Sequence, residues 1–142
     1  MHTEGSFEPT SVDAVTDRYA DLGPTAQIVV KEVAKAMAFD ATEYDRRVTA
    51  DVVATAREVL FAQALLVHVG TREEYDAWQA ESEYPIAEWT VEEIGAEAVD
   101  RVAWHAAPAV ETLVAATFQD EPDAAVGTLR RHALGQCYRD VV

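Results

Sequence analysis

The stretch Arg101-Val-Ala-Trp-His-Ala-Ala107, followed after a short link by Thr112-Leu-Val-Ala-Ala-Thr-Phe118, decides the fold because it predicts a β-hairpin. Pro108 opens the link, and a proline ends a strand because its ring fixes φ and it has no amide hydrogen to donate. Side chains alternate between the two faces of a strand. The first strand therefore has two sets of side chains, Val102, Trp104 and Ala106 on one face and Ala103, His105 and Ala107 on the other. We expect Trp104 to lie in the core.

The residues before this hairpin predict a helical half of the molecule. Residues 1–10 show no periodic pattern and are expected to form a loose arm. A first helix over 11–22 is expected to end at Gly23, and Pro24 suits the first turn of a second helix over 25–39. The second helix is apolar almost all round, which is typical of a helix buried on most sides. We expect it to be the central helix of this half.

Shorter elements follow in the middle of the chain. A helical stretch over 41–64 pauses near Thr49. The apolar run 65–69 predicts a short buried strand, and Thr71 with Glu74 forms a capping box that begins a new helix.

The last elements complete an α+β pattern. A weak alternation predicts a strand over 86–94, and acids at 120–123 begin a final helix because negative charge is favourable at a helix N-terminus. The order of elements predicts a helical N-terminal half followed by a small, mainly antiparallel sheet covered by helices, with ferredoxin-like or split βαβ character. We expect a single domain over 1–142, with the arm 1–10, a helical half 11–64 and a sheet-plus-helix half 65–142.

The charge balance is strongly acidic, with 26 Asp and Glu against 11 Lys and Arg and a formal net charge of −15. Only two of the bases are lysines, Lys31 and Lys35, and alanine is common. These features indicate adaptation to molar salt inside the cell, because salt at 1 M screens the repulsion between carboxylates to a Debye length of ~3 Å. The alternative is an acidic protein that binds a basic partner.

Several partners and compartments are disfavoured. Nothing basic runs along the chain far enough to follow phosphates, so we expect no nucleic-acid partner. The longest apolar stretch, 59–69, is shorter than the ~20 residues that cross a bilayer, so we expect no membrane partner. Residues 1–9 lack the basic and apolar regions of an export signal. A single cysteine excludes an intramolecular disulfide. We therefore expect a cytoplasmic protein.

Two histidines, His68 and His105, fall on predicted strands and are the candidate metal ligands. If these strands are neighbours, the imidazoles could share a face and form a site with His132 or Glu93. No pair of ligands has the helical i, i+4 or CxxC spacing of a metal site. The lack of such a spacing favours the alternative, in which each histidine is partly buried and hydrogen-bonded to the backbone. We therefore expect no metal and no cofactor.

Catalytic residues are not indicated by any motif, since no GxSxG elbow, P-loop, GxGxxG, HExxH or EF-hand pattern is present. Cys137 could act as a nucleophile with His132 or His105 as its base. It falls on the apolar stripe of the last predicted helix, where a free cysteine usually behaves as a small buried hydrophobe. We therefore assign no catalytic residue.

Two tryptophans, Trp78 and Trp89, flank the uncertain stretch 79–88. Large aromatic side chains serve either as core anchors or as hot spots of interfaces. The sequence leaves both roles open for this pair, and they are the candidate interaction residues.

Two stretches, Gly70-Thr-Arg-Glu-Glu-Tyr-Asp-Ala-Trp78 and Val102-Ala-Trp-His-Ala-Ala-Pro108, carry a family resemblance together with residues 32–40 and 116–121. Through them the whole chain resembles a domain-of-unknown-function family of small acidic proteins encoded by halophilic archaea. The resemblance agrees with the salt-adapted composition. It implies no activity, ligand or site residue.

The preferred hypothesis is a cytoplasmic, non-enzymatic module that binds a protein partner or associates with itself. It rests on the lack of a catalytic motif and on a strand-rich half with few residues to shield its edges. The alternative is a small-molecule or metal-binding domain, which could be an enzyme, with a pocket near His68 and His105.

Overall fold

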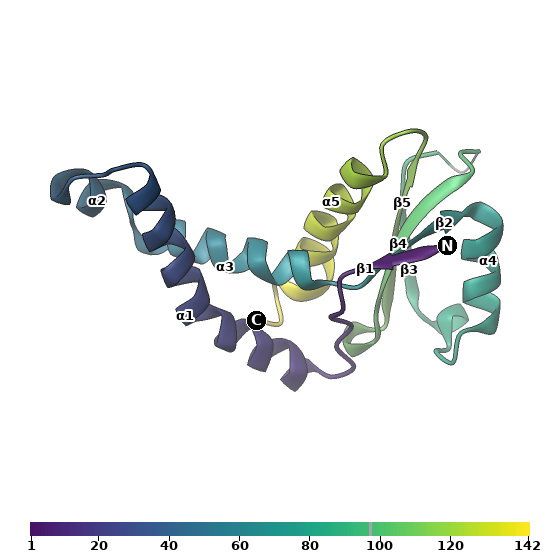
Figure 1. Cartoon of the computed structure of the whole chain (residues 1–142). Coiled ribbons are helices and arrows are strands. Elements are labelled where there is room, and N and C mark those ends of the chain that lie inside the picture. Colours follow the sequence, from purple (N-terminus) through teal and green to yellow (C-terminus); the bar gives the residue numbers. More distant parts are fainter. Residues whose placement is uncertain (97) are drawn as a thin grey trace.

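The computed structural model of the chain describes residues 1–96 and 98–142. It shows an α+β protein, as predicted, in which a five-stranded sheet with helices on both faces forms one end. Three helices, α1 (Val12–Ala36), α2 (Ala41–Arg47) and α3 (Ala50–Ala64), project from this end, and α2 lies at the far tip (Figure 1).

The predicted β-hairpin is confirmed and forms the middle of the sheet. Strand β4 (Arg101–Ala107) pairs antiparallel with β5 (Thr112–Phe118), and Trp104 lies opposite Ala115. A short 3₁₀ turn η2 (Pro108–Val110) follows β4, and Glu111 completes the link with a left-handed φ of 50°. Pro108 therefore ends the first strand, as predicted from its fixed φ and missing amide hydrogen.

The sheet has the strand order β1-β2-β4-β5-β3. Three of its four pairs are antiparallel, whereas β3 pairs parallel with β5. The remaining strands and the helices of this half are β1 (His2–Glu4), β2 (Val67–Thr71), α4 (Arg72–Glu81), η1 (Ile86–Glu88), β3 (Thr90–Ile94), α5 (Pro122–Ala133) and the π turn η3 (Leu134–Tyr138). The sheet is mainly antiparallel, as expected. It differs from a ferredoxin-like sheet because α4 and α5 cover opposite faces (Figure 1).

The expectation of a loose arm over residues 1–10 is wrong. His2 to Glu4 form an edge strand that pairs antiparallel with β2. Further along the arm, the Phe7 amide donates to the Ala64 carbonyl (2.8 Å) and the Phe7 carbonyl accepts from the Leu66 amide (2.9 Å). The arm satisfies backbone groups that β2 would otherwise leave unpaired. Such long-range pairing leaves no periodic signal in so short a segment.

The predicted break at Gly23 and Pro24 is also wrong, because α1 runs through both residues. The contact with α3 holds this part of the helix together. Arg57 of α3 places its guanidinium beside Gly23 and donates through Nε to the Tyr19 carbonyl (2.6 Å), in the turn before Pro24. A tertiary donor thus serves the backbone where the proline weakens the helical hydrogen bonding.

The helix start predicted from a capping box is confirmed, because Thr71 with Glu74 forms the complete capping box of α4. The predicted pause near Thr49 is also present: the Asp40 and Thr49 side chains cap two separate helices, α2 and α3. Capping needs only a few neighbouring residues, so the local sequence contains the signal for such a start.

The sheet separates two hydrophobic cores. One core lies between the sheet and α5 with the proximal parts of α1 and α3, and its largest side chains include Phe61, Leu65 and Tyr138. The other core lies beneath α4 and is built around Trp104, which is fully buried. The predicted core position of Trp104 is confirmed.

Candidate interaction surface

The outer half of α1 exposes large apolar side chains. Ile28 is 62% exposed, Val33 is 52% exposed and Met37, just beyond the helix, is 57% exposed. Only Ala26, Val30 and Ala34 are buried in this part of the helix. The expectation of a central helix buried on most sides is therefore wrong. Among the described residues, only α3 makes extensive packing contacts along α1, and it covers one face.

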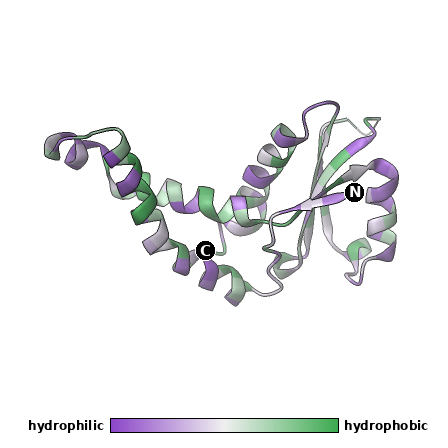
Figure 2. Ribbon diagram, viewed as in Figure 1, coloured by the Kyte–Doolittle hydropathy of each residue, from purple (hydrophilic) through white to green (hydrophobic). Residues whose placement is uncertain are grey.

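A second set of exposed apolar side chains lies on α3. Val52 is 42% exposed and Val59 is 48% exposed. A spacing of seven residues places both on the same side of a helix. Figure 2 shows hydrophobic residues on the part of α1 and α3 that extends away from the sheet.

The exposed valines of α1 and α3 lie on the same side of the helical pair. The two helices are antiparallel (Figure 1), and Tyr19 sets their register through contacts with Arg57 and Phe61. Each residue of a helix is turned by 100° from the one before it. Val29 and Val33 are turned away from the face of α1 that contacts α3. Val52 and Val59 are turned in the same sense away from the face of α3 that contacts α1. For an antiparallel pair, rotation in the same sense leads to the same side. We call Val29, Val33, Val52 and Val59 the valine face.

The segment that carries the valine face is nearly neutral in a strongly acidic chain. Residues 26–64 contain five bases and six acids, so they hold a net charge of −1 out of the total of −15. The bases are Lys31, Lys35, Arg46, Arg47 and Arg57, and the acids are Glu32, Asp40, Glu43, Asp45, Asp51 and Glu58. A second macromolecule of any charge meets little repulsion at this end of the molecule.

The two candidate metal ligands, His68 and His105, lie on opposite faces of the sheet. His68 of β2 is paired with Trp104 of β4, so these two side chains share the face under α4. His105 follows Trp104 and therefore points to the other face, towards η3. Among residues 1–96 and 98–142, no group of three or more His, Cys, Asp and Glu side chains is arranged to hold a metal ion.

His105 is a fully buried histidine with both ring nitrogens engaged. Its Nδ1 lies 2.6 Å from the Leu66 carbonyl, which can only accept, so Nδ1 carries the hydrogen and Nε2 accepts from the Tyr138 hydroxyl at 2.6 Å. Burial lowers the pKa of His105 to about 4 and raises the pKa of Tyr138. The pair joins β4 to the C-terminal turn as a neutral, satisfied contact.

His68 belongs to an aromatic cluster under α4. Its ring stacks on Trp104 at 5.3 Å and lies 5.3 Å from Trp78. Burial lowers the pKa of His68. Trp78 is half-buried in this cluster, whereas Trp89 is only 9% exposed and stacks on Tyr84. Both tryptophans therefore pack mainly within the protein, and Trp89 presents little surface to a partner.

The remaining candidates for chemistry are dispersed. Cys137 is 3% exposed, and burial raises the pKa of its thiol to about 12, so the thiol stays neutral. The His132 Nε2 lies 3.1 Å from the Glu92 carboxylate, and among the described residues no hydrogen bond joins the His132 ring to Cys137. Glu93 forms an ion pair with Arg72 on the other face of the sheet.

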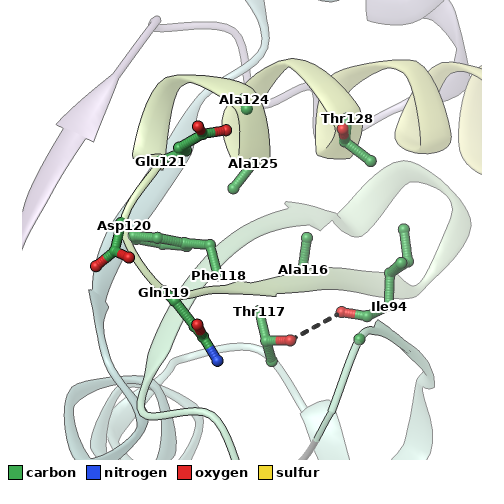
Figure 3. A pocket seen from close by; sticks show the side chains of 11 residues that line it. Ile94, Ala116, Thr117, Phe118, Gln119, Asp120, Glu121, Ala124, Ala125 and Thr128 are labelled. Carbon is green, nitrogen blue, oxygen red and sulfur yellow. Dashed lines mark hydrogen bonds between the residues drawn. The ribbon is translucent and has the colours of Figure 1, made fainter.

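One pocket lies between the end of β5 and the start of α5 (Figure 3). It has a volume of about 440 Å³ and is open to solvent. Two carboxylates, Asp120 and Glu121, stand at its edge, and the Thr117 hydroxyl is engaged with the Ile94 carbonyl (3.4 Å). The side chains around it include no histidine, cysteine, lysine or arginine. Among the described residues, neither threonine hydroxyl of this lining is hydrogen-bonded to a carboxylate, so the pocket holds no activated nucleophile.

The structure thus defines an α+β protein with a projecting pair of helices that exposes a valine face. Comparison with family models places the chain in a family: residues 6–139 match the model described as a family of unknown function (DUF5809), and the chain belongs to this family. No curated protein and no solved structure matches the chain. No helix within residues 1–96 and 98–142 is both long and apolar enough to span a membrane.

The all-round apolar pattern of 25–39 is the sequence signal for the valine face, although the same pattern also predicts burial. Such a helix is buried only if enough other elements surround it. Because the predicted helices 11–22 and 25–39 form one helix, α1, the other helices of this half are α2 and α3. These two helices cannot enclose α1, so part of its apolar surface remains exposed.

Proposed function

We propose that the chain is a non-enzymatic protein-binding module of a haloarchaeal cytoplasm, and that the valine face is its binding surface. The observation that carries the proposal is the exposure of four valines, each 38% to 52% exposed, on one side of a projecting helical pair. Exposed apolar side chains on one side of a surface element are typical of an interaction site.

The charge distribution supports a binding role for this end of the molecule. The near-neutral segment 26–64 contrasts with the rest of the chain, which carries a net charge of −14. Interfaces are depleted in charged residues at their centre and polar at their rim. The valine face agrees with the first of these features, since valines occupy it.

The alternative function, a small-molecule or metal site near His68 and His105, gains no support from the geometry. A shared site requires both imidazoles in one cavity, and the register of β2 and β4 directs them to opposite faces of the sheet. Each histidine instead packs in a different hydrophobic core.

The test is affinity capture by the tagged chain from a haloarchaeal lysate in molar KCl, with mass spectrometry of the bound proteins. Val33→Glu places a charge on the valine face, and Ile28→Glu places the same charge on α1 outside that face, where Ile28 is 62% exposed. We expect a stoichiometric protein that binds the wild type and Ile28→Glu but not Val33→Glu. Equal capture by all three chains contradicts the proposal, and so does the absence of any bound protein if the wild type also stays monomeric.

A further inference from the structure

Building on the proposed function, we infer that the occupant of the valine face is a second copy of this chain. The two copies are related by a two-fold axis that runs through the valine face, across the long direction of α1 and α3. Each copy then presents Val29, Val33, Val52 and Val59 to the same residues of its partner. An interface of this type is self-complementary and closes as a dimer.

The chemistry of the face favours a copy of the same chain over a different protein. Interfaces between different proteins depend on a few large anchors, mostly Trp, Tyr and Arg, that enter pockets on the partner. The valine face offers only small aliphatic side chains. Such a surface fits another flat aliphatic surface, and homodimer interfaces are more apolar than interfaces between separately stable proteins.

The charges favour the same arrangement. Two copies with a net charge of −15 repel each other unless the contact keeps their acidic parts apart. Residues 26–64 hold only −1 of this charge, so the contact itself adds little repulsion. The two-fold axis also sends the two sheet ends in opposite directions, because each sheet lies at one end of its helical pair (Figure 1).

The area of the valine face can be compared with that of a standard protein interface. The outer half of α1, from Ala26 to Met37, is about 18 Å long, and two neighbouring helices are about 20 Å wide, which gives roughly 360 Å² in projection from each copy. A standard interface buries about 800 Å² of accessible surface per partner. Side chains enlarge the projected area, and a hollow of about 370 Å³ between α3 and α5, lined in part by Val59, extends it. The contact is therefore smaller than a standard interface, and we expect a reversible dimer whose fraction rises with protein concentration.

The first test measures mass in solution by size-exclusion chromatography with light scattering, in molar KCl, from low micromolar to submillimolar protein. The wild-type mass is expected to approach twice the 15.6 kDa of one chain as the concentration rises. Val33→Glu is expected to raise the dissociation constant at least tenfold, and Ile28→Glu is expected to behave as the wild type. Circular dichroism verifies that both variants are folded, which their exposed positions favour.

The second test uses cysteine cross-linking, since Cys137 is buried and its thiol stays protonated. Val33→Cys therefore introduces the one reactive thiol, and Ile28→Cys is its matched control. A short bis-maleimide is expected to join Val33→Cys chains much faster than Ile28→Cys chains. Equal rates for both variants overturn the two-fold contact through the valine face.

The outcomes separate this inference from the proposed function. A wild type that stays at 15.6 kDa across the whole range overturns the dimer. If a different protein is then captured by the wild type and lost with Val33→Glu, the dimer is excluded while the proposed function is supported. If the wild type neither dimerises nor captures any protein, both are overturned.

Discussion

His105 links two parts of the fold that are distant in the sequence. Through its two ring nitrogens it joins Leu66, the residue before β2, to the C-terminal turn, at Tyr138. Because neither imidazole nitrogen is exposed to water, the neutral form is strongly favoured and the pKa is lowered to about 4. The residue therefore couples stability to pH without taking part in chemistry.

This coupling gives a prediction with a definite sign. An unfolded histidine has a pKa of about 6.5, so between pH 6.5 and 4 the unfolded chain binds a proton that folded His105 does not bind. Stability is fully present above about pH 6.5 and falls as the pH is lowered, by up to about 1.4 kcal/mol per pH unit for this group. The free energy of unfolding, measured with urea between pH 6.5 and 5.5, should change less with pH in His105→Gln than in the wild type. His68, whose pKa is also lowered, adds to the slope with the same sign.

A surface variant, His2→Gln, serves as the control for this measurement. His2 is exposed on β1, and its ring Nε2 lies 3.1 Å from the Glu4 carboxylate. We expect it to keep the wild-type slope. An unchanged slope in His105→Gln would mean that His105 titrates alike in the folded and unfolded chains.

Trp104 allows a direct measurement of the core under α4. The side chain is 0% exposed and packs against Tyr75, Trp78 and His68. Trp104→Ala is expected to lower the free energy of unfolding by ~3–5 kcal/mol. Urea unfolding in molar KCl measures this free energy. Trp78→Ala is the control, and we expect a smaller loss of stability there because Trp78 is only half-buried. A loss below about 1 kcal/mol for Trp104→Ala would be the value of a surface position.

At the scale of an element, α1 shows how tertiary contacts overcome a local signal. Gly23 and Pro24 together indicate the end of one helix and the start of another. In the structure the helix continues, and the Arg57 side chain supports the turn that precedes the proline. The local cost of the proline remains, because its nitrogen cannot donate to the carbonyl of Ala20.

Replacing this proline is therefore expected to stabilise the protein. Pro24→Ala restores a helical donor and should raise the free energy of unfolding by about 1–3 kcal/mol, measured by urea unfolding. Thr25→Ala, at the next exposed position, changes only the helix propensity and should add less than about 1 kcal/mol. A loss of stability in Pro24→Ala would show that α1 needs the irregular turn in order to pack on α3.

At the scale of the whole molecule, the acidic charge is spread unevenly between the two ends. The sheet end and the proximal helices carry nearly all of the net charge, whereas the projecting segment is close to neutral. Repulsion among the carboxylates opposes the compact state in dilute buffer and is screened by molar salt. The stability of the fold is therefore expected to depend on salt concentration through these residues.

We expect the melting temperature to fall when KCl is reduced from molar concentration to about 0.1 M, because the Debye length rises from ~3 Å to ~10 Å. The measurement should include Val33→Glu as well as the wild type. A dimer adds stability that depends on protein concentration, and this variant removes that contribution. A melting temperature that does not depend on salt would contradict the proposed adaptation to molar KCl.

The sequence by itself determined the features that depend on neighbouring residues. The alternation over 101–118 and the proline between its halves were enough to place β4 and β5, because a strand pair joined by a short turn is a local structure. The start of α4 followed from the capping box of Thr71 and Glu74 for the same reason.

Only the tertiary structure decided the features that depend on what lies opposite each element. The pairing of β2 with β4 sends His68 and His105 to opposite faces of the sheet. The free edge of β2 turns the N-terminal arm into a strand. The sparse covering of α1 leaves Val29 and Val33 exposed and so creates the valine face. Periodicity shows which residues share a side of an element, whereas burial depends on whether another part of the chain reaches that side.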